Sequence, residues 1–424
     1  MLGTNKDNLN KEKIITFFLD FTTGQKFKIH GNQNDSFKYI LYKFLKETSK
    51  ENFKNKIKYA LCNANKIDFN KSLLENKIIQ NCHVVCFIGN SIKIDNKCNK
   101  IATGFKYYGS ITKSGRDQNG FKKINQDRII IYLNIGNIDG FNLFGILDGH
   151  GAHGHLVSDF CRYYFIKKMD EYAEKCKLEN KSNPNDIYIE LKETKFKFLI
   201  DCFNNADLEM LEKKSFDCNL SGTTCNIVIQ LNKYLICANV GNSRSILIYD
   251  NDTKTNQGIC PLSIDHTPDL PGEYQRIIQS GGITNKYKYE NGIIDNNTRI
   301  FFPGQNLPGI ALSRALGDLM AKRCGVISEP DIKVFKLNHN SKYLLIYSDG
   351  IWKYLKNEEI RDLGNIYFPK EEIGHFCENL VRKAVINWEE KDIIRDDISV
   401  ICVIFNYVYF SYLYFIFNVF TKFY

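Results

Sequence analysis

The chain has 424 residues, of which 43% are apolar and 25% charged, and its formal net charge is +9. That composition is typical of a soluble globular protein with one large or two moderate domains. The positive charge is spread over separated lysines, which disfavours dedicated nucleic-acid binding. The 14 cysteines are scattered without a C-x-x-C pair, so a disulfide framework or zinc site is also disfavoured.

The N-terminal residues 1–11 are polar and are expected to be disordered. They offer neither a signal peptide nor a glycine at the second position for myristoylation. Together with the reduced cysteines, this favours an intracellular protein, cytoplasmic or nuclear.

The next segment, residues 12–90, shows strand and helix patterns that predict a small domain of its own. Its predicted elements are a hairpin, a capped amphipathic helix and two further strands, at residues 15–21, 26–30, 37–45, 57–61 and 83–88. This order resembles the ubiquitin-like β-grasp fold, which implies a surface for a protein partner. An irregular extension packed on the rest of the chain remains the alternative. Residues 91–99 are polar and are expected to form a linker.

The larger region, residues 100–406, alternates runs of strands with runs of helices. Its first predicted elements are two strands, at 129–133 and 144–147, on either side of a hairpin turn at 136–140. Two helices follow, at 154–175 and 196–206, with a loop insertion at 177–186 between them. A meander of three strands is predicted at 226–230, 234–239 and 245–249. A helix at 273–279 and a glycine- and asparagine-rich excursion at 284–300 follow, and core strands are predicted at 343–347 and 398–405. Segregated runs of this kind indicate a layered α+β fold.

The most informative stretch is the apolar run Phe144 to Leu147, which is stopped by Asp148-Gly149-His150-Gly151. A carboxylate at the end of a core strand is held rigidly, and a glycine beside it lets the backbone carbonyl approach a cation. An imidazole two residues further along can exchange protons near neutral pH. Taken alone, the tetrapeptide fits an ordinary turn equally well.

Many further motifs accompany this stretch in a fixed order along the chain. They are Lys123-Ile124-Asn125-Gln126-Asp127-Arg128, Ser221-Gly222-Thr223-Thr224, Gly241-Asn242-Ser243-Arg244, Asp265-His266-Thr267-Pro268, Gly281-Gly282, Ser313-Arg314-Ala315-Leu316-Gly317-Asp318, Ser348-Asp349-Gly350-Ile351-Trp352 and Asp396-Asp397-Ile398-Ser399-Val400. From Tyr107 to Phe405, the chain thus closely resembles the metal-dependent serine/threonine protein phosphatases of type 2C, the PPM family. The resemblance implies two packed antiparallel sheets flanked by helices.

The resemblance also implies a chemistry and a set of residues. Two divalent ions, Mg²⁺ or Mn²⁺, would be held by four carboxylates and one carbonyl, those of Asp127, Asp148, Asp349, Asp396 and Gly149. A hydroxide bridging the ions would attack phosphoserine or phosphothreonine in a phosphorylated protein substrate directly. His150 matches the residue proposed as general acid, and the alternative is a hydrogen-bonded loop histidine.

Departures from the family's pattern concern phosphate binding first. The family often has Glu before the first ligand Asp, where this chain has Gln126, and an arginine where this chain has Lys122. Arg116 lies in the same loop and is the other candidate for phosphate binding, because a guanidinium grips phosphate through two hydrogen bonds.

Two further departures concern a third, weaker metal of the family. Asn242 and Lys353 stand where relatives carry aspartates that support this metal, so the third site is expected to be weak or absent. Arg314 and Asp318 are interpreted as structural residues that hold a loop beside the site.

The tail at residues 407–424 is almost wholly apolar and aromatic, but it is short for the roughly 20 residues that a membrane span needs. Membrane contact, an extra strand and an unselected extension all remain open. For the whole chain, the leading hypothesis is an active, monomeric phosphatase. The alternative is a pseudophosphatase that serves as a protein-binding module, because Gln126, Asn242 and Lys353 depart from the family.

Overall fold

The computed structural model describes residues 14–21, 26–48, 57–62, 65–66, 68, 70–73, 75, 83–88, 105–213, 216–249, 258–288, 294–368, 373–392 and 394–405. The chain divides into two compact units, Met1–Cys98 and Asn99–Tyr424. Among the described residues, we find no helix with the length and apolar character that crossing a bilayer requires. The predicted linker and the apolar tail lie outside the described residues.

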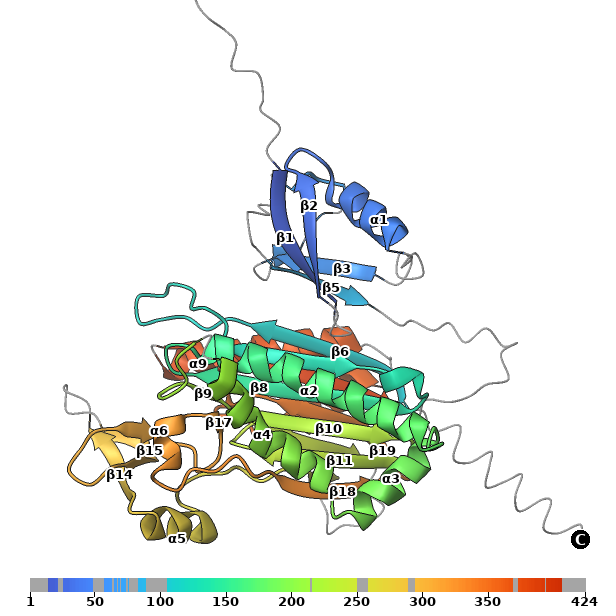
Figure 1. Ribbon diagram of the computed structural model, residues 1–424. Helices are drawn as coiled ribbons and strands as arrows, with labels where there is room; N and C mark the ends of the chain where they lie inside the picture. Colours follow the sequence, from blue (N-terminus) through green and yellow to red (C-terminus); the bar gives the residue numbers. More distant parts are fainter. Residues whose placement is uncertain are drawn as a thin grey trace, which may run out of the picture. The chain divides into compact units, whose positions relative to one another are not determined.

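Within its described residues, the first unit forms a five-stranded sheet with a helix, α1, beside it. Figure 1 labels this helix and most of the strands. Its elements are β1 (Ile14–Phe21), β2 (Lys26–Asn32), α1 (Phe37–Glu47), β3 (Ile57–Cys62), β4 (Asn65–Lys66) and β5 (His83–Ile88). The strand order is β2-β1-β5-β3-β4, with β1 antiparallel to β2 and parallel to β5. Ser36 caps α1 by accepting a hydrogen bond from the Tyr39 backbone N–H at 3.2 Å. The predicted hairpin, helix and strands are therefore confirmed as elements.

The second unit is built on two antiparallel sheets. The first sheet runs β17-β9-β8-β10-β11-β18 with β7 beside β8, and its strands are β7 (Asp127–Tyr132), β8 (Phe141–His150), β9 (Gly222–Thr223), β10 (Cys225–Leu231), β11 (Tyr234–Val240), β17 (Leu316–Gly317) and β18 (Asp331–Lys336). The second sheet runs β13-β12-β19-β20-β6, with strands β6 (Phe105–Lys113), β12 (Arg244–Tyr249), β13 (Ile259–Pro261), β19 (Ser341–Tyr347) and β20 (Ile398–Phe405).

Alternating side chains place the core of this unit between the two sheets. Along β8, Phe144 and Ile146 join a buried cluster with Leu344 and Ile346 of β19, whereas Leu143 and its neighbours on the other face pack against helices. Successive side chains on a strand face opposite sides, so each sheet has one face for its partner sheet and one for a helical layer.

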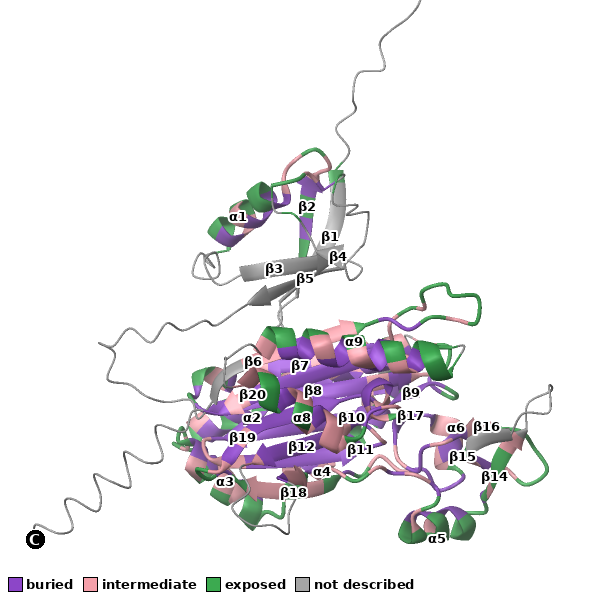
Figure 2. Ribbon diagram, turned by 180° about the vertical axis from the view of Figure 1, so that it is seen from behind, coloured by how far each residue is buried: buried purple, intermediate pink, exposed green. Residues whose placement is uncertain are grey.

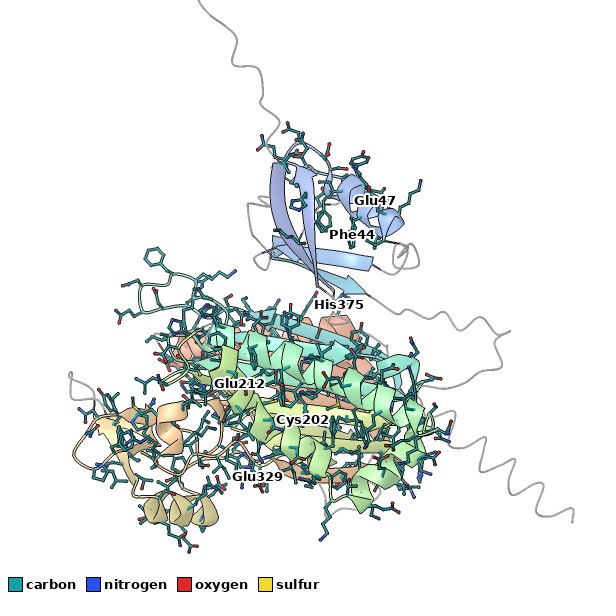
Figure 3. The ribbon with its side chains drawn as sticks, viewed as in Figure 1. Phe44, Glu47, Cys202, Glu212, Glu329 and His375 are labelled. Carbon is teal, nitrogen blue, oxygen red and sulfur yellow. The ribbon has the colours of Figure 1, made fainter. Side chains whose placement is uncertain are left out.

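Helices cover both outer faces, as Figures 1 and 2 show from opposite sides. The first sheet is covered by α2 (Gly154–Leu178), α3 (Pro184–Glu193) and α4 (Lys197–Lys213), and the second by α7 (Asp349–Trp352), α8 (Asn357–Tyr367) and α9 (Ile373–Lys391). Two residues labelled in Figure 3 mark the faces of α4: Cys202 is buried in the core, and Glu212 is exposed to solvent. The result is a four-layer α+β sandwich, which confirms the expected fold class for this unit.

A small subdomain extends from one end of the sandwich and has its own buried cluster around Ile277, Ile300 and Val326. Its elements are α5 (Pro271–Gln279), β14 (Ile283–Lys288), β15 (Ile294–Phe301), β16 (Pro308–Ile310) and α6 (Leu319–Lys322). The excursion predicted at 284–300 contains most of the antiparallel pair β14–β15, and these two strands were not predicted. Its polar residues hid the alternation by which strands are recognised.

Two other predicted elements also need correction. The meander ends at β11, because β12 pairs with β19 in the second sheet after the turn at Gly241, where φ is +92°. The loop predicted at 177–186 is shorter, because Pro184 starts α3 and Asn183 caps it. Proline is favoured in the first helical turn, where its missing N–H has no helical acceptor to lose.

Candidate active site

The four predicted carboxylates are brought to one end of the sandwich by the ends of its strands. Asp127 begins β7 and lies directly opposite Asp148 in the β7–β8 ladder. Asp349 begins α7 directly after β19, and Asp396 precedes β20, the antiparallel neighbour of β19. The hydroxyl of Ser348 donates to Asp127 Oδ2 at 3.1 Å and thereby joins the two sheets at this point.

Burial and mutual repulsion make these carboxylates unusual. Burial, followed by the charges of neighbouring aspartates, raises the pKa of Asp127 to about 8 and that of Asp349 to about 6. The same two causes raise the pKa of Asp148. Within the described part of the chain, Asp127 Oδ1 and Asp349 Oδ1 are buried and accept no hydrogen bond. Such oxygens are strong candidates for cation ligands, because burying a charged acceptor without a partner is costly.

The donor set fits hard divalent cations, since every candidate ligand is an oxygen atom. Among the described residues, no three His, Cys, Asp or Glu side chains are grouped closely enough to hold an ion by themselves. Mg²⁺ commonly keeps several waters and takes only one or two carboxylates. The carboxylates therefore fit an ion whose coordination is completed by water and by substrate oxygens.

Gly149 lies in a space that admits no side chain. A Cβ atom there would lie 2.5 Å from the carbonyl oxygen of Gly154 and 2.7 Å from that of Gln126. The Gly149 N–H donates to the Gln126 carbonyl at 3.2 Å, and the Gln126 side-chain amide donates to the Gly151 carbonyl at 2.7 Å. Gln126 thus fixes the loop that carries Gly149 and His150, a role that does not require the glutamate common in the family.

His150 faces a carboxylate that sequence reasoning assigned to another task. Its Nε2 atom lies 2.6 Å from Asp318 Oδ2, across 168 positions of sequence. Burial by itself would lower the pKa of His150, but the Asp318 carboxylate outweighs burial, so the pKa lies above its usual value. The interpretation of Asp318 as a purely loop-holding residue was incomplete, because its side chain orients the candidate general acid.

The backbone around Asp318 explains how the carboxylate reaches the histidine. Asp318 has a φ of +49°, and its N–H donates to the Ser221 carbonyl at 3.0 Å. A Cβ atom on Gly222 would lie only 2.0 Å from Asp318 Oδ2, so this approach needs glycine there. Because His150 and Asp318 are 168 positions apart in the sequence, the motifs that contain them gave no indication of their contact.

Basic residues reach the site from the loop at 115–126. The Lys123 ammonium lies 3.5 Å from Asp396 Oδ1, a contact that was not predicted from the sequence because the two residues are 273 positions apart. Burial alone would lower the pKa of Lys123, but Asp396 and Asp397 outweigh it and raise the pKa. The backbones of Arg116 and Lys122 form an isolated antiparallel β-bridge across the loop, and both residues are exposed. Their role in phosphate binding stays a prediction.

Asn242 and Lys353 both lie beside Asp349. The Asn242 amide donates to Asp349 Oδ2 at 3.4 Å, and the positive charge of Lys353 lowers the pKa of the same carboxyl against the larger effect of burial. The Lys353 ammonium itself lies 3.7 Å from Asp392 Oδ2 and 4.4 Å from the centre of the Trp388 ring. At the two positions where the family resemblance leads one to expect aspartates, the structure therefore has an amide and an ammonium, both hydrogen-bond donors.

The two-sheet sandwich, with buried carboxylates and a paired histidine at one end, agrees with what comparisons with known proteins show. The profile of the family described as Protein phosphatase 2C matches residues 113–387. Probable protein phosphatase 2C 72 of Arabidopsis thaliana is 33% identical over 290 residues, which are 67% of this chain and 82% of that protein. Probable protein phosphatase 2C 41 of the same plant is 30% identical over 332 residues, 75% of this chain and 90% of that protein.

A solved structure agrees at the level of the fold. The serine-threonine phosphatase 2C from Toxoplasma gondii aligns with a TM-score of 0.59 and 18% identity, covering 72% of this chain and 98% of that one. From the profile and the plant relatives together, the chain belongs to the protein phosphatase 2C family. Its enzyme class is therefore that of the serine/threonine protein phosphatases.

Proposed function

We propose that the protein is a metal-dependent phosphatase that hydrolyses phosphoserine and phosphothreonine in protein substrates. Two ions, Mg²⁺ or Mn²⁺, would be held by the Asp127, Asp148, Asp349 and Asp396 carboxylates and the Gly149 carbonyl. When bound, the ions would supply positive charge for the phosphoryl oxygens and lower the pKa of water. The observation that carries the proposal is the pair of buried carboxylate oxygens, Asp127 Oδ1 and Asp349 Oδ1, that accept no hydrogen bond.

The remaining steps belong to side chains of this chain. The Lys123 ammonium, with Arg116 and Lys122 on the same loop, would hold the substrate phosphate against the carboxylates. Because Asp318 engages His150 Nε2, Nδ1 is the nitrogen that would pass a proton to the leaving serine or threonine oxygen. Asp318 supports this step by holding the ring in one orientation and favouring its charged form.

A phosphatase assay on a phosphothreonine peptide tests the proposal. Activity should require added Mg²⁺ or Mn²⁺ and disappear in EDTA, because the proposed ligands are hard oxygen donors. Calorimetry should detect ion binding to the same protein without substrate. Full activity in excess chelator would contradict the two-ion proposal.

The alternative of a pseudophosphatase rests on the amide of Asn242, which lies where a carboxylate would serve a further ion and donates to Asp349 instead. In that case the protein would bind phosphopeptide but release no phosphate with either metal. A phosphate-release assay beside a phosphopeptide-binding measurement separates the two functions.

For the first unit, we propose an independent ubiquitin-like β-grasp domain over residues 12–90 that binds a protein partner. The sheet order β2-β1-β5-β3-β4, with a parallel β1–β5 pair, supports this assignment. So does the amphipathic helix α1, which follows the first hairpin. Chemical-shift dispersion in an NMR spectrum of residues 1–98 alone would test whether the segment folds by itself.

A further inference from the structure

The loop at 115–126 is fastened at both ends to the residue that follows a candidate metal ligand. Asp397 accepts the Gly115 N–H on Oδ1 at 2.6 Å and the Gln126 N–H on Oδ2 at 2.7 Å. Arg116 and Arg395 exchange two backbone hydrogen bonds, of 2.8 and 3.1 Å. Because Asp396 lies between Arg395 and Asp397, the base of the loop and this ligand are parts of one hydrogen-bonded unit.

The tip of the loop is also ordered by its own hydrogen bonds. Asp117 Oδ1 accepts the backbone N–H groups of Asn119 and Phe121, both at 2.9 Å. The turn is completed at Gly120, whose φ of +79° is a conformation that favours glycine. A Cβ atom added at Gly120 would meet no neighbouring atom within 4 Å. The tip therefore presents its side chains from a defined backbone.

Two large apolar side chains on this loop are turned to solvent. Phe121 is 70% exposed and Ile124 is 68% exposed, and among the large apolar residues that the structure describes only Leu178 is more exposed, at 85%. Figure 2 shows the loop after β6 as an exposed projection at the end of the sandwich from which the subdomain of α5, β14–β16 and α6 extends. Single exposed apolar residues are common, but two on a fixed loop beside an active site are suited to contact what binds there.

We infer that Phe121 and Ile124 form a docking surface for the polypeptide that flanks the phosphorylated residue, and that the surface selects substrates with an apolar side chain in this flank. The inference rests on the proposed function and adds a determinant of its substrate choice. The occupant is argued from continuity with the candidate active site. Lys123, which lies between the two apolar residues in sequence, contacts Asp396, so this loop adjoins the carboxylates where the substrate phosphate would lie. Apolar contacts of this kind give binding energy without altering the chemical step.

A peptide series combined with variants tests the inference. Phosphothreonine peptides with a single leucine moved through successive flanking positions are assayed with wild type, Phe121→Ala, Ile124→Ala and the double variant. For wild type, leucine at one position should raise kcat/KM by about tenfold over the all-alanine flank, a gain that each single variant reduces and the double variant removes. The change should appear mainly in KM.

Two controls separate this inference from the proposed function and from general damage. Leu178→Ala removes a more exposed apolar side chain at the far end of α2 and should keep the full gain from leucine. The assay with p-nitrophenyl phosphate, which has no flanking polypeptide, reports whether the catalytic site works. Wild type inactive on both substrates overturns the proposed function, and with it the docking surface. An active wild type with no preferred position, or a preference that survives in the double variant, overturns the docking surface alone.

Discussion

At the scale of single residues, the site is defined by carboxylates that the fold forces together. Asp127 and Asp148 are partners in one ladder, and like charges opposite each other destabilise a sheet unless a cation lies between them. The positions of these residues could be predicted from the sequence, because each follows or precedes an apolar strand. The contact of His150 with Asp318 could not be predicted. It depends on a loop that is distant in sequence and on the left-handed backbone conformation of Asp318.

Removing one carboxylate should therefore abolish turnover while leaving the sandwich folded. For Asp148→Ala and Asp349→Ala, we expect kcat to fall by at least about a hundredfold, because each variant loses one of the proposed cation ligands. Calorimetric titration should show weaker Mn²⁺ binding in both variants, and circular dichroism should show an intact fold. Asp201→Ala, on the exposed face of α4, is the matched control. Activity within twofold of wild type would remove the substituted residue from the site.

Asn242 and Lys353 lead to a second prediction about metal stoichiometry. The protein should bind two metals per chain, because Asn242 donates to Asp349 and Lys353 places a positive charge near the same carboxyl. Asn242→Asp combined with Lys353→Asp should add a weak third site and raise turnover at high Mn²⁺. Lys353→Asp alone should do less, since Asn242 still offers a neutral oxygen and the new carboxylate would lie near Asp392.

Metal titrations of wild type, the single variant and the double variant decide this second prediction. Three sites in wild type, or no new site in the double variant, would show that these positions do not control a third metal.

At the scale of elements, the strands of the sandwich could be predicted and their partners could not. The apolar runs that became β10, β11, β19 and β20 were recognisable from composition alone. The change of sheet between β11 and β12 depends on a turn at Gly241 that avoids the side chain of Thr224, a tertiary contact. The hairpin β14–β15 was missed because its polar strands lack an alternating pattern.

The helix α5 and the loop before α6 are held together by one buried carboxylate, which gives a pH-dependent prediction. Glu273 Oε2 accepts the Ser313 hydroxyl at 2.6 Å and Arg276 at 2.7 Å, and Oε1 accepts Arg314 at 2.8 Å. Burial would raise the pKa of Glu273, but the two arginines and the serine outweigh burial and hold the pKa well below its ordinary value of 4.5. The interpretation of Arg314 as structural agrees with these contacts.

A carboxyl whose pKa is lowered on folding stabilises the protein above its ordinary pKa, and this stabilisation is lost as the pH falls below that value. Glu273→Gln should therefore lower the free energy of unfolding by about 3 kcal/mol at neutral pH, since two partly buried guanidinium groups lose the carboxylate that they share. Urea unfolding should show this difference from wild type shrink steadily as the pH is taken below about 4.5. Glu193→Gln, at an exposed position at the end of α3, is the control. A difference of constant size at every pH would contradict the assignment.

At the scale of the whole molecule, the described strands and core residues divide between the two units. Among the described residues, each sheet of the second unit is built from strands from β6 onward, and its buried clusters draw on the same range. The described sheet of the first unit is built from β1 to β5. A unit that has its own core can in general fold alone.

A chain that begins at Asn99 should therefore be soluble and keep its activity on a phosphothreonine peptide within about twofold, because no described strand or core residue of the sandwich is removed. Residues 1–98, expressed separately, should fold by themselves, as judged by a cooperative urea transition. Activity on a larger phosphoprotein is the informative comparison. If the first unit binds substrates, its removal should lower activity only on those phosphoproteins that bind this unit. Insolubility of the shortened chain together with no independent folding of residues 1–98 would favour an integral extension over a separate domain.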